Sequence, residues 1–187
     1  GAISVTNQFA KLGETNGSIR LGVGDEGQFI AEGVYNAALS ESAAIRIAAR
    51  HDERDGTFAN STTGDELNGR DHDQFRIGFT ANVGESLTVN AYWDHFEMEN
   101  RWQMVDNFGL WGNDLFGDEI AVNGQPSQTI DADLDVLKLT WELENGMSLT
   151  SNTGLYNSSI VALPTDADTG EFPIVDFIEP WDLEQVT

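Results

Sequence analysis

Apolar and polar residues alternate strictly in several parts of the chain, and this alternation constrains the fold more than any other feature. It is clearest in residues 42–50, SAAIRIAAR, where the odd positions are Ala or Ile and the even positions include Arg46 and Arg50. Successive side chains of a strand point to opposite faces. The segment is therefore predicted to be a strand with one apolar face and one polar, basic face.

The same period of two predicts further strands on both sides of this segment. Counting only clear alternation, the sequence predicts seven strands, at residues 18–23, 29–37, 42–50, 75–83, 87–94, 136–143 and 147–155. The start of an eighth is predicted near Trp181. Asn145-Gly146 is the strongest hairpin-turn dipeptide in the chain, and it joins two of these segments directly.

The connections between the predicted strands alternate in length. Residues 39–41, 84–85 and 145–146 are tight turns, whereas 51–73, 100–129 and 160–180 are long; the short turn at 25–27 is the exception. Strands that run up and down, with short turns at one end and long loops at the other, are typical of outer-membrane barrels. We therefore expect an all-β fold: an antiparallel meander that forms a partial transmembrane β-barrel, with its long loops on one side.

Composition excludes several classes of function. The chain has 187 residues, a net charge of −23 and no cysteine. Nucleic acid is not expected as a partner, because phosphate binding needs a basic surface. Disulfides and Cys-ligated zinc are impossible. No apolar run approaches the roughly 18 residues of a transmembrane helix. The chain opens on GAISVT without a secretory signal pattern, which suggests a fragment.

Several stretches resemble a known family, the TonB-dependent outer-membrane receptors. GAISVT at residues 1–6 is similar to the closing strand of that family's plug domain, and RIAARHDERDGTFAN at 46–60 to its third barrel strand and following loop. Asn36, Ala37 and Leu39-Ser40 resemble the end of the second strand, and the final WDLEQVT resembles the approach to a later one. The resemblance implies a fragment: residues 1–16 as the end of the plug and a linker, and 17–187 as the N-terminal part of the barrel.

The resemblance also implies a function, a location and partners. Such receptors lie in the bacterial outer membrane and take up a scarce nutrient, most often an iron–siderophore chelate, in an energy-coupled way. The implied partners are the lipid bilayer, the nutrient ligand and a TonB-type energy-transducing protein, which would contact a plug segment that this chain lacks. Neither enzymatic activity nor a cofactor is expected, and no G-x-S-x-G nucleophile motif is present.

Aromatic residues in the second long loop are the candidate ligand-binding residues. They are Trp102, Phe108, Trp111 and Phe116. Aromatic side chains in an external loop can bind an apolar or ring-bearing ligand, but they can also pack the loop on itself or belong to an interfacial belt. The histidines near the first loop, beside Asp71 and Asp73, could in principle bind a metal. A solvated loop is the preferred interpretation, and no metal site is predicted.

A soluble alternative remains open at this point. A secreted β-sandwich that binds carbohydrate through aromatic, Asp-rich loops would show the same alternation. The two architectures differ in what the apolar faces contact, because a sandwich buries them between two sheets whereas a barrel turns them outward as one band.

Overall fold

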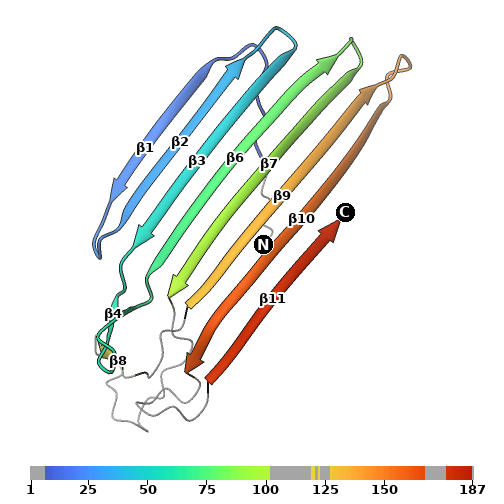
Figure 1. Cartoon of the computed structure of the whole chain (residues 1–187). Helices are drawn as coiled ribbons and strands as arrows, with labels where there is room; N and C mark the ends of the chain where they lie inside the picture. The colour runs from blue at the N-terminus through green and yellow to red at the C-terminus, as the bar shows by residue number, and fades with distance from the viewer. Residues whose placement is uncertain (1–6, 102–118, 121, 123–126, 167–175, 187) are drawn as a thin grey trace.

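A single antiparallel sheet of eight strands dominates the structure (Figure 1). The computed structural model describes residues 7–101, 119–120, 122, 127–166 and 176–186. The strands of the sheet are β1 (Asn16–Val23), β2 (Phe29–Ala38), β3 (Ala43–Arg54), β6 (Arg70–Val83), β7 (Leu87–Arg101), β9 (Ser127–Glu142), β10 (Ser148–Asp166) and β11 (Asp176–Val186). They lie side by side in chain order, so the predicted all-β antiparallel meander is confirmed.

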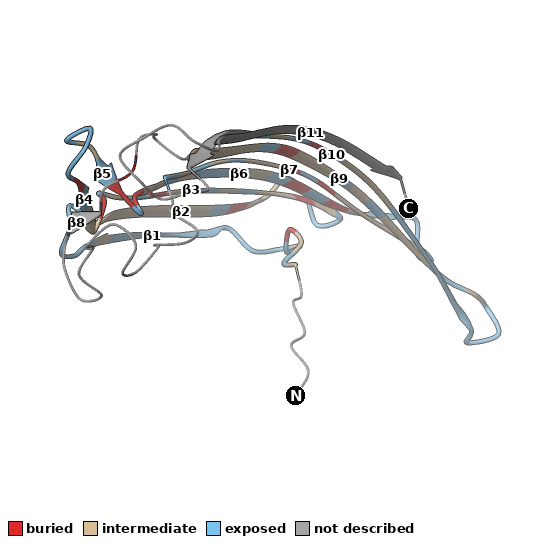
Figure 2. Ribbon diagram, turned by 90° about the horizontal axis from the view of Figure 1, so that it is seen from below, coloured by how far each residue is buried: buried red, intermediate tan, exposed pale blue. Residues whose placement is uncertain are grey.

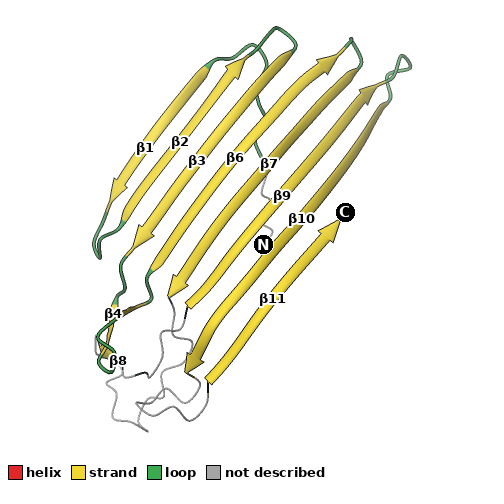
Figure 3. Cartoon of the chain, viewed as in Figure 1, coloured by secondary structure: helices red, strands yellow, loops and turns green. Residues whose placement is uncertain are grey.

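A small second sheet lies at one end of the large one. It contains β4 (Phe58–Asn60), β5 (Glu66–Leu67) and β8 (Glu119–Ile120), in the order β5-β4-β8. Figure 3 shows the described residues as strands and loops only. Within this part of the chain no helix is long and apolar enough to cross a membrane.

Several strands are longer than the alternation predicts. The predicted first long loop, 51–73, is wrong at both ends, because β3 continues to Arg54 and β6 begins at Arg70. His51 pairs with Asp73, and Asp52 with His72, so these polar residues continue the same antiparallel ladder. The predicted third long loop is also too long, because β10 extends to Asp166 and β11 already begins at Asp176.

Short turns join the strands at one end of the sheet. Gly84 and Gly146 have φ angles of 68° and 79°, a backbone conformation that glycine adopts without strain. The described parts of the connections between β3 and β6 and between β7 and β9 lie at the opposite end, called the loop end below. The parallel pairing of Ala59 with Glu119 joins these two connections, which confirms the prediction that they leave the sheet on the same side.

The sheet is arched, and its two faces differ (Figure 2). The segment that leads into β1 lies on the concave side of the arch. Among the described residues, the buried apolar side chains are few: Ala10, Ala44, Leu67, Tyr92, Val122 and Ala132. A soluble domain of comparable length would bury a much larger apolar core. Among the described residues, no second packed layer therefore covers the apolar side chains of the arched sheet.

Candidate functional site

The four aromatic residues predicted to bind ligand lie outside the described residues. They are Trp102, Phe108, Trp111 and Phe116. Their assignment therefore stays a prediction. The described parts of the same connection are β8 and Val122, and both lie against the first loop.

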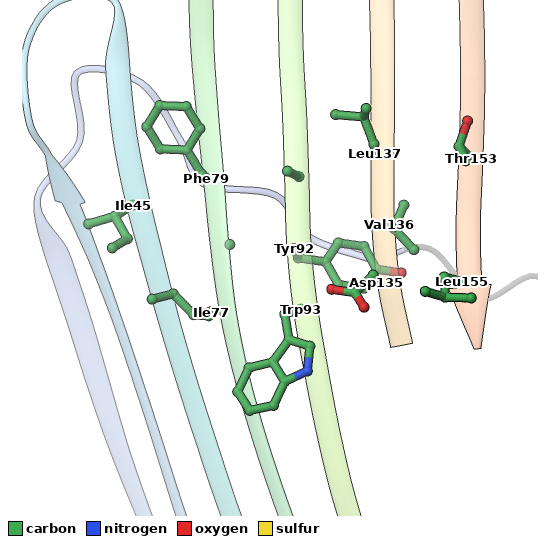
Figure 4. A pocket seen from close by; sticks show the side chains of 12 residues that line it. Ile45, Ile77, Phe79, Tyr92, Trp93, Asp135, Val136, Leu137, Thr153 and Leu155 are labelled. Carbon is green, nitrogen blue, oxygen red and sulfur yellow. The ribbon is translucent and has the colours of Figure 1, made fainter. Parts of the chain in front are cut away.

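An exposed apolar band covers the convex face. Its members occupy the odd positions of neighbouring strands and lie in register, as in the row Tyr35–Ile47–Ile77–Trp93. Its exposed members include Ile19, Leu21, Ile47, Phe75, Ile77, Phe79, Trp93, Leu137, Trp141 and Leu149. Figure 4 shows a depression at the middle of the sheet, with Ile77, Phe79, Trp93 and Leu137 among its lining residues. A contiguous apolar surface of this kind marks an interaction with lipid or protein.

Aromatic rings border the band toward the loop end. The ring of Trp93 lies 6.0 Å from that of Phe75 and stacks on His95 at 5.7 Å, measured between centroids. The indole Nε1 of Trp93 donates a hydrogen bond to Asp133 (3.0 Å). A large ring whose N–H reaches a polar partner suits the boundary between an apolar and an aqueous phase.

Beyond the aromatic border, the convex face becomes strongly acidic. We call this surface the acidic belt; its carboxylates are Glu53, Asp71, Asp73, Glu97, Glu99, Asp131, Asp133 and Asp135. Several of them face each other directly across the ladder: Asp73 pairs with Glu97, and Glu97 with Asp131. Like charges in directly opposite positions destabilise a sheet. A cation that lies close to the acidic belt would therefore stabilise the sheet.

Two histidines lie within the acidic belt. His51 Nδ1 lies 2.9 Å from Asp73 and 3.8 Å from Asp71, and its Nε2 lies 3.6 Å from Glu53. The hydrogen bond to Asp73 raises the pKa of His51 above its ordinary value of 6.5, and the nearby negative charges add to the effect. His95 Nδ1 lies 3.1 Å from Asp133.

Both histidines have the surroundings of possible metal ligands. Ligand atoms of His51, Asp71 and Asp73 lie within 4.8 Å of one another, and so do those of His95, Asp131 and Asp133. His51 and His72 both flank the predicted first long loop, but the structure places them on opposite faces of the sheet. His72 belongs to the even positions of β6, on the opposite face, and bonds to Asn100 Oδ1 at 2.8 Å.

The concave face carries most of the basic residues, and several of them are paired with carboxylates. Asp52 accepts hydrogen bonds from Arg50 (2.8 Å) and from Nε and a terminal nitrogen of Arg70 (3.1 and 3.0 Å). Burial favours a higher pKa of Asp52, but the two guanidinium groups outweigh it and hold the pKa below its ordinary value. Glu32 accepts from Arg20 at 3.2 Å and from Arg50 at 2.9 Å. These charges of the concave face therefore pair with each other within the sheet.

A second ion pair lies deeper on the concave face. The side chain of Asp94 is only 6% exposed and accepts hydrogen bonds from Arg76 and Gln74. The Arg76 guanidinium also lies 4.8 Å from the centroid of the Tyr92 ring. Asn7 connects Arg76 with Tyr92, because its Oδ1 accepts a hydrogen bond from Arg76 (3.1 Å) and its Nδ2 donates one to the Tyr92 hydroxyl (2.7 Å).

Residues 7–15 are held against the concave face by this polar network. Asn36, which is completely buried, donates from Nδ2 to the carbonyls of Lys11 (2.9 Å) and Glu14 (2.7 Å), and its Oδ1 accepts from the Lys11 amide (2.8 Å). Arg46 donates to Gln8 at 3.1 Å. This docking could not be predicted, because a segment without periodicity indicates only a loop.

The first long connection and the described part of the second form one packed module at the loop end. Leu67 and Val122 are buried together, with Phe58 packed against them. The buried Asn60 accepts hydrogen bonds through Oδ1 from the amides of Thr62 (3.1 Å) and Val122 (3.2 Å). The module therefore connects residues that are far apart in sequence.

Comparison with known proteins adds no relative to these observations. The chain matches no protein-family model, no curated protein and no solved structure. Its function is therefore inferred from the two faces of the sheet and from the sequence.

Proposed function

We propose that the chain is the N-terminal part of the barrel of a TonB-dependent outer-membrane receptor, which takes up a scarce nutrient such as an iron–siderophore chelate. The single observation that supports this most strongly is the two-faced, arched meander. One face carries an exposed apolar band, and the other carries paired charges and the segment 7–15.

The apolar band has the dimensions of a membrane contact. Strands that cross an outer membrane need roughly 9–11 residues, and the uninterrupted alternation of β6 from Phe75 to Val83 has this length. The band is bounded by short turns at one end and by aromatic rings and carboxylates at the other. Outer-membrane barrels show the same order of apolar surface, aromatic girdle and polar loops.

The soluble sandwich is not favoured, because the described residues contain no second layer facing the band. Ile19 and Val23 on β1 are 82% and 86% exposed, and Phe79 in the middle of the sheet is 41% exposed. A sandwich would bury such residues between its sheets. Lipid is the solvent that would cover them in the proposed receptor.

The concave face suits the interior of a plugged barrel. Several of its charges are paired within the sheet, and residues 7–15 run along it through hydrogen bonds to Asn36, Arg46 and Arg76. This arrangement supports the proposed division into the end of a plug domain and linker (1–16) and a barrel part (17–187).

Nutrient uptake is the part of the proposal that depends on the resemblance. The described parts of the two long connections lie at the same end and pack into one module. Trp102, Phe108, Trp111 and Phe116 belong to the second of these connections, where they would contact a ligand at the mouth of the barrel. A TonB-type protein would supply energy through the plug.

A cysteine scan tests the membrane contact. The chain has no native cysteine, so single cysteines at 75, 77 and 79 and, as matched controls on the other face of the same strand, at 78, 80 and 82 can each carry a fluorescent label. We expect brominated lipids in reconstituted vesicles to quench the first set and spare the second. Equal quenching of both sets, or a chain that stays in solution beside the vesicles, would exclude a lipid-facing band.

Uptake is tested in the parent receptor. The double substitution Trp102→Ala/Trp111→Ala should reduce uptake of the ferric chelate, whereas Trp141→Ala on the apolar band should not, with surface abundance measured for each variant. If uptake is unchanged in the double variant, these two aromatics have no part in ligand binding.

A further inference from the structure

The acidic belt contains one arrangement of three residues twice. In each copy a histidine on one strand lies directly opposite the second aspartate of an Asp-x-Asp sequence on the next strand of the sheet. His51 of β3 pairs with Asp73 of β6. His95 of β7 pairs with Asp133 of β9. The first group consists of His51, Asp71 and Asp73, and the second of His95, Asp131 and Asp133. All six residues occupy odd positions, so both groups lie on the convex face.

The donor atoms of both groups have the spacing of metal ligands. A tetrahedral zinc ion that binds its ligands at about 2.0–2.1 Å holds them roughly 3.4 Å apart. His51 Nδ1 lies 2.9 Å from Asp73 and 3.8 Å from Asp71, one distance on either side of that value. In the second group His95 Nδ1 lies 3.1 Å from Asp133. Small rotations of side chains at the surface are therefore enough to close either group around an ion.

The surroundings of each group supply the outer contacts that metal ligands use. A histidine that binds a metal through one ring nitrogen usually turns the other toward a carboxylate or a carbonyl. The Nε2 of His51 faces Glu53 at 3.6 Å. In the second group the indole Nε1 of Trp93 donates a hydrogen bond to Asp133 at 3.0 Å, which orients this carboxylate. Glu53 and Trp93 are not members of the two groups, so their positions support a site independently of the ligands.

A further carboxylate, that of Glu97, lies between the two groups. It pairs with Asp73 across β6 and with Asp131 across β9. Three negative charges therefore follow each other on neighbouring strands, and such pairs of like charges destabilise a sheet. A divalent ion in each group would offset this repulsion.

We propose that the two groups are a pair of binding sites for zinc or a similar divalent transition-metal ion. Imidazole suits zinc, copper, iron and nickel, whereas sites made of oxygen ligands alone suit magnesium and calcium. One nitrogen and two oxygens leave a fourth position for water or for Glu97.

The bound ions would fasten the loop end of the sheet. The first ion joins β3 to β6, and the second joins β7 to β9. The sequence predicts no metal site here, because it assigns His51 and Asp71 to a loop, whereas the structure continues both strands through them. The proposal depends on strand register, and it holds whether or not the apolar band contacts lipid or the chain takes part in uptake.

The first experiment is a calorimetric titration of the whole, metal-free chain with zinc chloride in detergent micelles. We expect two zinc ions per chain, bound at least about tenfold more tightly than calcium. His51→Gln and His95→Gln should each remove one site. The matched control is His72→Gln, which changes a histidine at the same end of the sheet but on the opposite face, and it should keep both sites. Binding of fewer than two ions, equal affinity for calcium, or binding that either of the first two substitutions leaves unchanged would overturn the proposal.

The second experiment tests whether the sites belong to the folded sheet. An ion that binds only the folded state stabilises it by mass action, so zinc should raise the urea midpoint of the wild type and of His72→Gln. The double variant His51→Gln/His95→Gln should show no such rise. If zinc leaves the wild-type midpoint unchanged or lowers it, the ion does not need the strand register, and the proposed sites are wrong.

Discussion

Removal of the Asp94 carboxylate is the sharpest test of the concave ion network. In Asp94→Ala the Arg76 guanidinium keeps Asn7 as a hydrogen-bond acceptor and the Tyr92 ring as a neighbour, but it loses its counter-charge. Breaking a buried ion pair costs about 3–5 kcal/mol. The Arg76 side chain is 22% exposed, so water recovers part of this. We expect a loss of about 2–4 kcal/mol in the free energy of unfolding.

The assay is equilibrium urea unfolding in detergent micelles, followed by tryptophan fluorescence. Glu85→Ala, an exposed carboxylate in a tight turn, is the matched control and should lie within about 0.5 kcal/mol of the wild type. The double variant Arg76→Met/Asp94→Leu should be more stable than Asp94→Ala, because no charge remains unpaired. The reasoning is refuted if Asp94→Ala is as stable as the control, or if the double variant is the least stable of the set.

Three further outcomes follow from the described contacts. Asn36→Ala removes three hydrogen bonds that hold the chain near Lys11, so trypsin should cut after Lys11 faster than in the wild type. Asn60→Ala should release Val122 from the loop module and increase amide hydrogen exchange at residues 58–67, while exchange in the middle of the large sheet stays unchanged. Because the folded-state pKa of Asp52 is lowered, the ionised carboxylate stabilises the folded state above the ordinary pKa of 3.8, and this stabilisation is lost as the pH falls below that value. Unfolding titrations should therefore show a smaller loss of stability in acid for Asp52→Asn than for the wild type.

The sequence predicts the middle of each strand better than its ends. From Phe75 to Val83 one face is apolar and the other polar, so the period of two is visible. From His51 to Arg54 both faces are polar, since the convex side carries the acidic belt and the concave side carries Asp52 and its arginines. The ladder continues there, but alternation in hydrophobicity has stopped, and the segment looks like a loop.

The contacts of the candidate surfaces were harder to predict than the surfaces themselves. Alternation assigns Arg50, Arg76 and Asp94 to one face, and the structure confirms it. It cannot show that Asn36 binds a segment more than 20 residues away in sequence. Nor can it reveal β4, β5 and β8, because strands of two or three residues have no measurable period.

The parallel pairing of β4 with β8 has a consequence for the order in which the molecule assembles. All strands of the large sheet pair with their predecessor in that sheet, so most of this structure can form as a row of successive hairpins. Ala59 instead pairs with Glu119, and two complete long strands, β6 and β7, lie between these residues in the sequence. Contacts over such separations form late, because the intervening chain must first be ordered. The loop module is therefore expected to close only after β7 is in place, which would make its closure a marker that the first half of the sheet has assembled in the correct register.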